Sequence, residues 1–208
     1  MKLTNLIWVL ALAGSVAACN SGSPLTNVRP PLTGTGGSDG GSMIEPGCDP
    51  PLPVGTGACT TPDNIAVYEE LVYIDEGGVA YTCNEATSAI GSDCIFGKEN
   101  SVPPLAGCGA EAGAVIGCFP NCDNATIQVA ADCVAQCVQD ATAEVSPPGL
   151  SDECVACTGA TVACGSANCT PFCSGDTNAP ACIECRCAND CIQSFDTCSG
   201  LPPTTTCG

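Results

Sequence analysis

The hydrophobic residues of this chain fall into three stretches with different patterns. Residues 6–13 (LIWVLALA) form an unbroken apolar run behind one positive charge at Lys2. Residues 20–47 are rich in Gly, Ser, Pro and Thr and have no apolar periodicity, so they cannot bury enough surface to order themselves. From residue 48 onward, apolar residues recur at helical spacing between cysteines and turn residues. The pattern predicts a leader at 1–18, a flexible tether at 19–47 and a folded domain at 48–208.

Helix start signals divide the first part of that domain. Thr61-Pro62-Asp63 combines a cap residue, a proline at the first helical position and an acid in the first turn. It predicts a helix through Leu71 that ends before Gly77-Gly78. A second short helix is expected from about Ala80 to Ile90. Cysteines become denser after residues 100–108, which mark a potential sub-boundary.

The second part has a clearer helical pattern. Asp123 or Asn124 can cap a helix that reaches Thr142, and Cys133 and Cys137 then share one face. That helix carries apolar residues at helical spacing: Ile127, Ala130, Val134 and Val138.

Two further start signals follow it. Ser151 with Asp152 and Glu153 starts another helix, in which Cys157 and Cys164 are nearly aligned and Cys154 lies close by. Thr170-Pro171 repeats the cap-plus-proline pattern and predicts a new helix there.

A last helix is expected from about Pro180 to Cys198, because Ser199-Gly200 followed by Leu201-Pro202-Pro203 is a typical helix stop. Cys187, Cys191 and Cys198 lie within about 40° of one another on it, whereas Cys182 and Cys185 lie on another side. Cysteines on two sides predict that this is the most buried helix of the domain.

The cysteine count changes the picture from an ordinary helical domain to a disulfide scaffold. Twenty-one cysteines in 208 residues exceed the proportion typical of other secreted proteins. Removing Cys19 leaves an even number, which can form up to ten bridges whose connectivity the spacing does not give. The predicted fold class is therefore all-α, small and disulfide-rich. The cysteines expected in bridges are Cys48, Cys59, Cys83, Cys94, Cys108, Cys118, Cys122, Cys133, Cys137, Cys154, Cys157, Cys164, Cys169, Cys173, Cys182, Cys185, Cys187, Cys191, Cys198 and Cys207.

The leader has a more specific feature at its end. The apolar run is too short to span a bilayer, and a charged start with small residues behind it describes a secretory signal peptide. Val16-Ala17-Ala18-Cys19 resembles the lipobox of bacterial lipoproteins, which implies acyl chains on Cys19 and anchoring in the outer membrane. The alternative is an ordinary signal peptide cut after Ala18, with Cys19 in a disulfide.

Charge limits the classes of partner. Twenty-two acids against four bases give a formal net charge of −18. Nucleic acid is excluded, because phosphate binding depends on Lys and Arg. The membrane is expected as a partner through Cys19. The simple interpretation of the acids is a soluble surface whose negative charges repel one another. The more specific interpretation is that they bind a cationic protein or calcium.

Catalysis and metal binding find little support in the residues. Without histidine, Ser-His-Asp and Cys-His sites are absent. A glycosidase-like pair of acids remains an alternative, but Glu69-Glu70, Asp75-Glu76 and Asp152-Glu153 are adjacent pairs whose side chains point apart. No cofactor is expected.

A metal-loaded or redox-active cysteine protein is the other alternative. This alternative rests on the close spacing of cysteines in Cys154-x2-Cys157 and in the run Cys182, Cys185, Cys187 and Cys191. An oxidising compartment favours disulfides instead.

The cysteine spacing after residue 118 resembles a recurrent cysteine-rich domain of secreted lipoproteins in environmental Gram-negative bacteria. The likeness is carried by residues 149–157 (GLSDECVAC), by Cys164-x4-Cys169-x3-Cys173, by the run from Cys182 to Cys191, and by residues 198–203 (CSGLPP). It implies architecture and location but no activity. The sequence thus predicts a lipid-anchored, non-catalytic structural or binding module of the cell envelope.

Overall fold

The computed structural model describes residues 46–174, 176–203 and 205–207. Over these ranges the chain forms seven helices, one sheet of two short strands and ten disulfide bridges, which confirms the predicted all-α, disulfide-rich class. The predicted leader, Cys19 and the tether as far as residue 45 lie outside the described residues. In chain order, the elements are α1 (Pro62–Glu70), β1 (Val72–Ile74), β2 (Ala80–Thr82), α2 (Cys83–Asp93), α3 (Gly109–Cys118), α4 (Asn124–Val145), α5 (Asp152–Cys173), α6 (Pro180–Ala188) and α7 (Cys191–Ser199).

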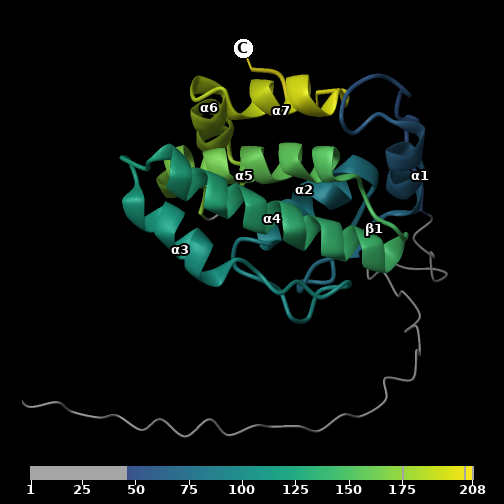
Figure 1. Ribbon diagram of the computed structural model, residues 1–208, viewed down its shortest axis with the longest axis horizontal. Helices are drawn as coiled ribbons and strands as arrows, with labels where there is room; N and C mark the ends of the chain where they lie inside the picture. Colours follow the sequence, from purple (N-terminus) through teal and green to yellow (C-terminus); the bar gives the residue numbers. More distant parts are fainter. Residues whose placement is uncertain (1–45, 175, 204, 208) are drawn as a thin grey trace, which may run out of the picture. The chain divides into compact units, whose positions relative to one another are not determined.

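Helix α5 is the centre of the domain. It packs against α4 on one side and against α6 and α7 on another, with α2 and α3 also in contact (Figure 1). Ten of its residues are buried, against one in α6 and three in α7. The prediction that the last helical segment is the most buried is therefore wrong, because α6 and α7 cover α5 and leave their own outer faces in solvent.

The segment predicted as one last helix is two. Helix α6 ends at Ala188 and α7 begins at Cys191, and between them Asp190 takes a left-handed conformation with φ 57°. A single residue in that conformation cannot continue a right-handed helix. The predicted end at Gly200 is confirmed, since this glycine has φ 72° and its N–H donates to the Asp196 carbonyl.

The helix start predicted at Thr170-Pro171 is also wrong, because α5 continues through Pro171 to Cys173. Proline costs a helix one hydrogen bond and introduces one steric clash. Near a helix end that cost is confined to the last turn, and the Thr170 hydroxyl donates back to the Ser166 carbonyl at 2.5 Å. Bridges from Cys169 and Cys173 to α6 hold both sides of the proline in place.

The helix predicted from Ala80 starts later than expected. Residues 80–82 form β2, which pairs antiparallel with β1, and α2 begins only at Cys83. Gly78, with φ 80°, lets the chain reverse between the strands. Tyr73 lies opposite Tyr81 in the register, and their rings stack with centroids 6.2 Å apart, a pair that stabilises a short hairpin.

The start predicted at about Pro180 is confirmed as that of α6, and the starts predicted at Thr61, at Asp123 or Asn124 and at Ser151 are confirmed with a capping hydrogen bond each. The side chains of Thr61, Asp123 and Ser151 accept hydrogen bonds from the backbone N–H three residues ahead. Helix α1 ends at Glu70, one residue before the prediction, and α4 runs three residues beyond Thr142.

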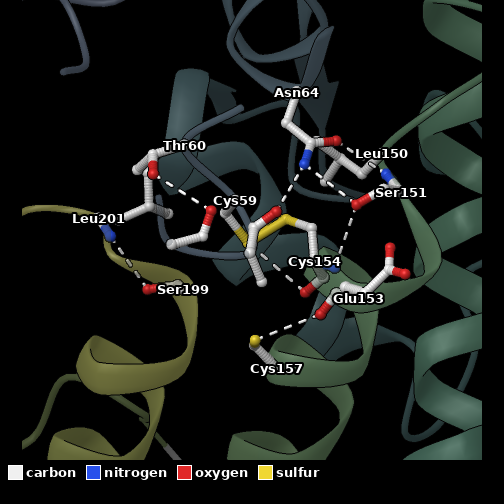
Figure 2. Close-up of a disulfide and its surroundings, with 12 residues drawn as sticks. Cys59, Thr60, Asn64, Leu150, Ser151, Glu153, Cys154, Cys157, Ser199 and Leu201 are labelled. Carbon is white, nitrogen blue, oxygen red and sulfur yellow. Dashed lines mark hydrogen bonds between the residues drawn. A yellow bond between two sulfur atoms is a disulfide. The ribbon is translucent and has the colours of Figure 1, made fainter. Parts of the chain in front are cut away.

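A buried asparagine ties α1 to the start of α5. Asn64 is 1 % exposed, and its amide donates to the Ala58 carbonyl at 2.7 Å and to the Ser151 hydroxyl at 3.1 Å (Figure 2). Its side-chain oxygen accepts from the Ser151 backbone N–H at 2.8 Å. Residues from both ends of the domain, from Cys59 to Leu201, share one hydrophobic core.

Candidate functional site

All twenty cysteines predicted to form bridges do so. The pairs are Cys48–Cys83, Cys59–Cys154, Cys94–Cys137, Cys108–Cys133, Cys118–Cys122, Cys157–Cys198, Cys164–Cys191, Cys169–Cys185, Cys173–Cys182 and Cys187–Cys207. Cys133 and Cys137, predicted on one face of α4, both join it to the segment that follows α2.

Four of these bridges form an antiparallel ladder between α5 and the α6–α7 segment. The four cysteines of α5 from Cys157 to Cys173 are 7, 5 and 4 residues apart. Their partners, taken backward from Cys198 to Cys182, are 7, 6 and 3 residues apart. Two antiparallel helices present matching positions at nearly equal spacing, so this mirrored spacing is the sequence signal from which the pairing could have been found.

The metal and redox alternative depended on neighbouring cysteines acting together. In the structure Cys182, Cys185, Cys187 and Cys191 are bonded to four different partners on α5 and the C-terminal segment. Over the described ranges, no three Cys, Asp or Glu side chains gather as metal ligands. These sulfurs therefore act as cross-links in the structure.

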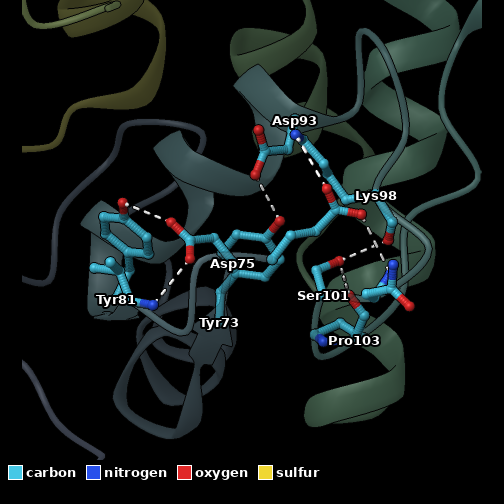
Figure 3. A network of polar contacts seen from close by, with 10 residues as sticks. Tyr73, Asp75, Tyr81, Asp93, Lys98, Ser101 and Pro103 are labelled. Atoms are coloured by element: carbon cyan, nitrogen blue, oxygen red, sulfur yellow. Dashed lines mark hydrogen bonds and ion pairs between the residues drawn. The ribbon is translucent and has the colours of Figure 1, made fainter. Parts of the chain in front are cut away.

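Three of the six acids considered for hydrolysis have structural partners instead of a shared cleft. Asp75 accepts hydrogen bonds from the Val79 N–H at 2.9 Å and the Tyr81 hydroxyl at 3.3 Å, which close the hairpin (Figure 3). Glu76 pairs with Lys98 at 3.4 Å. Glu70 accepts from the Ser146 hydroxyl at 2.5 Å.

Asp152 and Glu153 are exposed in the first turn of α5, and Glu69 is exposed at the end of α1. No two of the adjacent acids face each other across a pocket.

A buried tyrosine in the same network makes the domain sensitive to alkali. Tyr73 is fully buried and donates its hydroxyl hydrogen to Asp93 at 2.7 Å, and burial and then this carboxylate raise its pKa above the ordinary value of 10.0. Burial also raises the pKa of Tyr68. Because these hydroxyls stay protonated in the folded state at a pH where the unfolded chain has lost the protons, stability is complete below pH 10 and falls above it.

We therefore expect the free energy of unfolding to fall between pH 10 and pH 12 by up to about 1.4 kcal/mol per pH unit for each such tyrosine. Urea unfolding at pH 9, 10 and 11 measures this slope. Tyr73→Phe should be less stable at pH 9, where it lacks the hydrogen bond to Asp93, and should show a shallower loss above pH 10. An equal slope in the variant and the parent would show that Tyr73 titrates normally.

One concave feature lies beside α5, and α4 contributes no residue to it. A pocket of about 190 Å³ is bounded by α2 and the residues after it, by α5, and by α6 and α7. Apolar side chains line part of it: Ile95, Phe96, Ile116, Val162, Ile192 and Phe195. Hydroxyl groups line much of the rest, among them Ser88, Ser92, Ser166 and Thr170. A mostly apolar concavity with a few polar groups is the common form of a small-molecule site.

Two groups of opposite charge share this pocket. Arg186 comes from α6, and burial lowers the pKa of its guanidinium. Asp196 comes from α7, and burial raises the pKa of its carboxyl. The Cys173–Cys182 bridge also lines the pocket and joins the end of α5 to the first turn of α6. The scaffold thus fixes the helix that carries the arginine.

Gly165 of α5 lies beside the arginine stem. A β-carbon there would lie 3.8 Å from the Cγ, Cδ and Nε atoms of Arg186, in ordinary van der Waals contact, so a longer side chain at this position would extend toward the arginine. Sequence reasoning missed this pocket, since its lining comes from five separate segments. The one feature of the sequence that could have pointed to the pocket is Arg186, since the chain has only four basic residues.

Comparison with protein-family models, with curated proteins and with solved structures finds no match. The chain's own geometry therefore carries the functional argument. Among the described helices none is long and apolar enough to cross a membrane.

Proposed function

We propose that this protein is a lipid-anchored, disulfide-stapled module of the bacterial cell envelope that acts by binding and not by catalysis. The observation that carries the proposal is the complete pairing of twenty cysteines in ten bridges. Such a density of bridges forms and persists in the periplasm or at the cell surface, and not in a reducing cytosol. It supports the export that the leader predicts.

Anchoring is the finer part of the proposal, and the lipobox supports it. Cys19 is the one cysteine left over when the other twenty pair among themselves. Two or more acyl chains on that residue would anchor the protein stably, since each buried methylene contributes about 0.8 kcal/mol. The resemblance of residues 149–203 to cysteine-rich lipoproteins of Gram-negative bacteria agrees with an outer-membrane location.

Binding is favoured over catalysis by what surrounds the charged groups. The acids that were considered as a hydrolytic pair close a turn, pair with Lys98 or Ser146, or lie exposed, while the pocket holds one cation, one carboxyl group and several hydroxyl groups. Disulfide bridges suit a binding module outside the cell, because they restrict the unfolded chain and so limit the local unfolding that proteolysis requires.

Palmitate labelling in a Gram-negative host tests the anchor. The parent chain should incorporate label, and the N-terminal peptide of the mature protein should begin at Cys19 with the added mass of acyl chains. Cys19→Ser should lose the label, whereas the neighbouring Ser21→Ala should keep it. An unlabelled parent with a free N-terminus would reject the anchor and leave a freely secreted protein.

A further inference from the structure

Arg186 is a half-buried cation that has no acidic partner among the residues that the structure describes. Lys98 and Arg186 are the basic residues of the described ranges, and Lys98 is paired with Glu76 at 3.4 Å. Within the described part of the chain, no carboxylate oxygen lies within 4.0 Å of the Arg186 nitrogens. A guanidinium carries five N–H donors, and withdrawing it from water without an anion costs free energy. An anion that enters the pocket recovers that cost.

Asp196 supplies the opposite charge in the same pocket. It is half-buried and forms no ion pair with Arg186. Had the two charges been in contact, the pair would have been neutralised and the pocket would offer little to a charged ligand. A cation and an anion that are held apart in one pocket are complementary to a molecule that carries both charges.

The protein's net charge favours such a molecule over a simple anion. With a formal charge of −18, the surface repels anions over a Debye length of about 8 Å at physiological salt. A zwitterion has no net charge, so it meets no comparable barrier before its carboxylate reaches Arg186. A simple cation is attracted by the surface but meets Arg186 inside the pocket.

The size and the lining of the pocket define the rest of the ligand. Its volume of about 190 Å³ somewhat exceeds that of an engineered cavity of about 150 Å³ that binds benzene. Its apolar wall includes Val162, Ile192 and Phe195. A body of about one aromatic ring or one branched aliphatic chain fills this space and leaves room for the polar head.

We propose that this pocket binds a small zwitterion with an apolar body, the chemistry of a free apolar α-amino acid. The ligand carboxylate pairs with Arg186, its ammonium group faces Asp196, and its side chain lies against the apolar wall. The inference rests on the binding role proposed above and names the class of ligand for that role.

Calorimetric titration with three related probes tests the charge requirement. L-phenylalanine carries both charges, 3-phenylpropionate lacks the ammonium group, and 2-phenylethylamine lacks the carboxylate. The protein for the titration is the chain from residue 20, exported behind an ordinary secretory leader, which keeps all twenty bridged cysteines. L-phenylalanine should bind saturably, and each single-charge analogue should bind at least tenfold more weakly, since truncating a charged hydrogen bond typically costs that much or more.

Charge-matched variants place the ligand in the pocket. Arg186→Met and Asp196→Asn should each weaken L-phenylalanine binding at least tenfold. Lys98→Met removes the same charge from the remote Glu76 pair, and Glu184→Gln neutralises an exposed acid of α6, so both should bind like the parent. Gly165→Leu should abolish binding, because its side chain projects toward Arg186 and fills the pocket. Melting temperatures near that of the parent show that the variants are folded.

Failure of the zwitterion can be separated from failure of the binding role. The proposal of a zwitterionic ligand is overturned if neither L-phenylalanine nor L-leucine gives saturable heat. It is also overturned if the single-charge analogues bind as tightly as L-phenylalanine. Native mass spectrometry of the exported protein then examines the binding role. A different retained small molecule that is lost in Gly165→Leu would reject the zwitterion and leave the binding module standing.

Discussion

Replacing Gly159 by leucine should lower the free energy of unfolding by about 3 kcal/mol or more. Gly159 lies on the side of α5 that faces α4, and a β-carbon there would overlap the Ala131 carbonyl oxygen. It would also lie 3.1 Å from the Ala131 carbonyl carbon and the Ala135 β-carbon. Because these atoms belong to the backbone and first side-chain atom of α4, the helices themselves must separate. Denaturant unfolding of the oxidised protein measures the loss.

Gly113→Leu is the matched control. Gly113 is exposed on α3 and a β-carbon there meets no atom within 4 Å, so leucine should leave stability unchanged or raise it by up to about 0.8 kcal/mol through helix propensity. If Gly159→Leu does not fold, Gly159→Ala provides the same comparison with the smallest added atom. Equal stability of the Gly159 and Gly113 variants would contradict the close contact between α4 and α5.

Removing the Cys59–Cys154 bridge by a double alanine substitution should lower the free energy of unfolding by about 4 kcal/mol through chain entropy, more than removal of the short Cys118–Cys122 bridge. The two cysteines are 95 residues apart and both fully buried, and they join the segment before α1 to the first turn of α5 (Figure 2). The Cys94–Cys137 bridge shortens the loop that Cys59–Cys154 closes to roughly 50 residues, which still leaves a large entropy for the bridge to remove. The two buried sulfurs also leave a cavity.

The double alanine variant of Cys118 and Cys122 is the comparison. Those residues are four apart and only half-buried, so their bridge contributes about 2 kcal/mol by the same relation. Guanidinium unfolding without reductant should therefore show the larger loss for the Cys59 and Cys154 variant. Equal losses would mean that the long bridge does not restrict the unfolded chain as the connectivity implies.

Local chemistry explains which parts of the fold could be predicted from the sequence. Thr61, Asp123 and Ser151 each satisfy a backbone N–H of the helix that follows, a contact made within four residues. Gly200 likewise ends α7 by its own conformation. The fold class followed from the number of cysteines and from helical spacing, neither of which depends on distant contacts.

Tertiary contacts decided the parts that were missed. Helix α5 continues through Pro171 because bridges on both sides of the proline hold its last turn against α6. The chain breaks between α6 and α7 at Asp190, in a left-handed conformation that aspartate adopts only in a minority of cases, so the residue type alone does not predict the break. The pocket is the extreme case, since Arg186 and Asp196 face the same space only after α6 and α7 are fixed to α5.

The mass of the exported, intact protein after alkylation in denaturant, with and without prior reduction, tests the stapled scaffold most directly. The ten bridges predict no alkyl adducts before reduction and twenty after it, with Cys19 blocked by its acyl chains. Peptide mapping without reduction should then recover the Cys157–Cys198 and Cys164–Cys191 pairs of the ladder. Several alkylated thiols in the unreduced protein would contradict the account and return attention to the cysteines as metal ligands or redox groups.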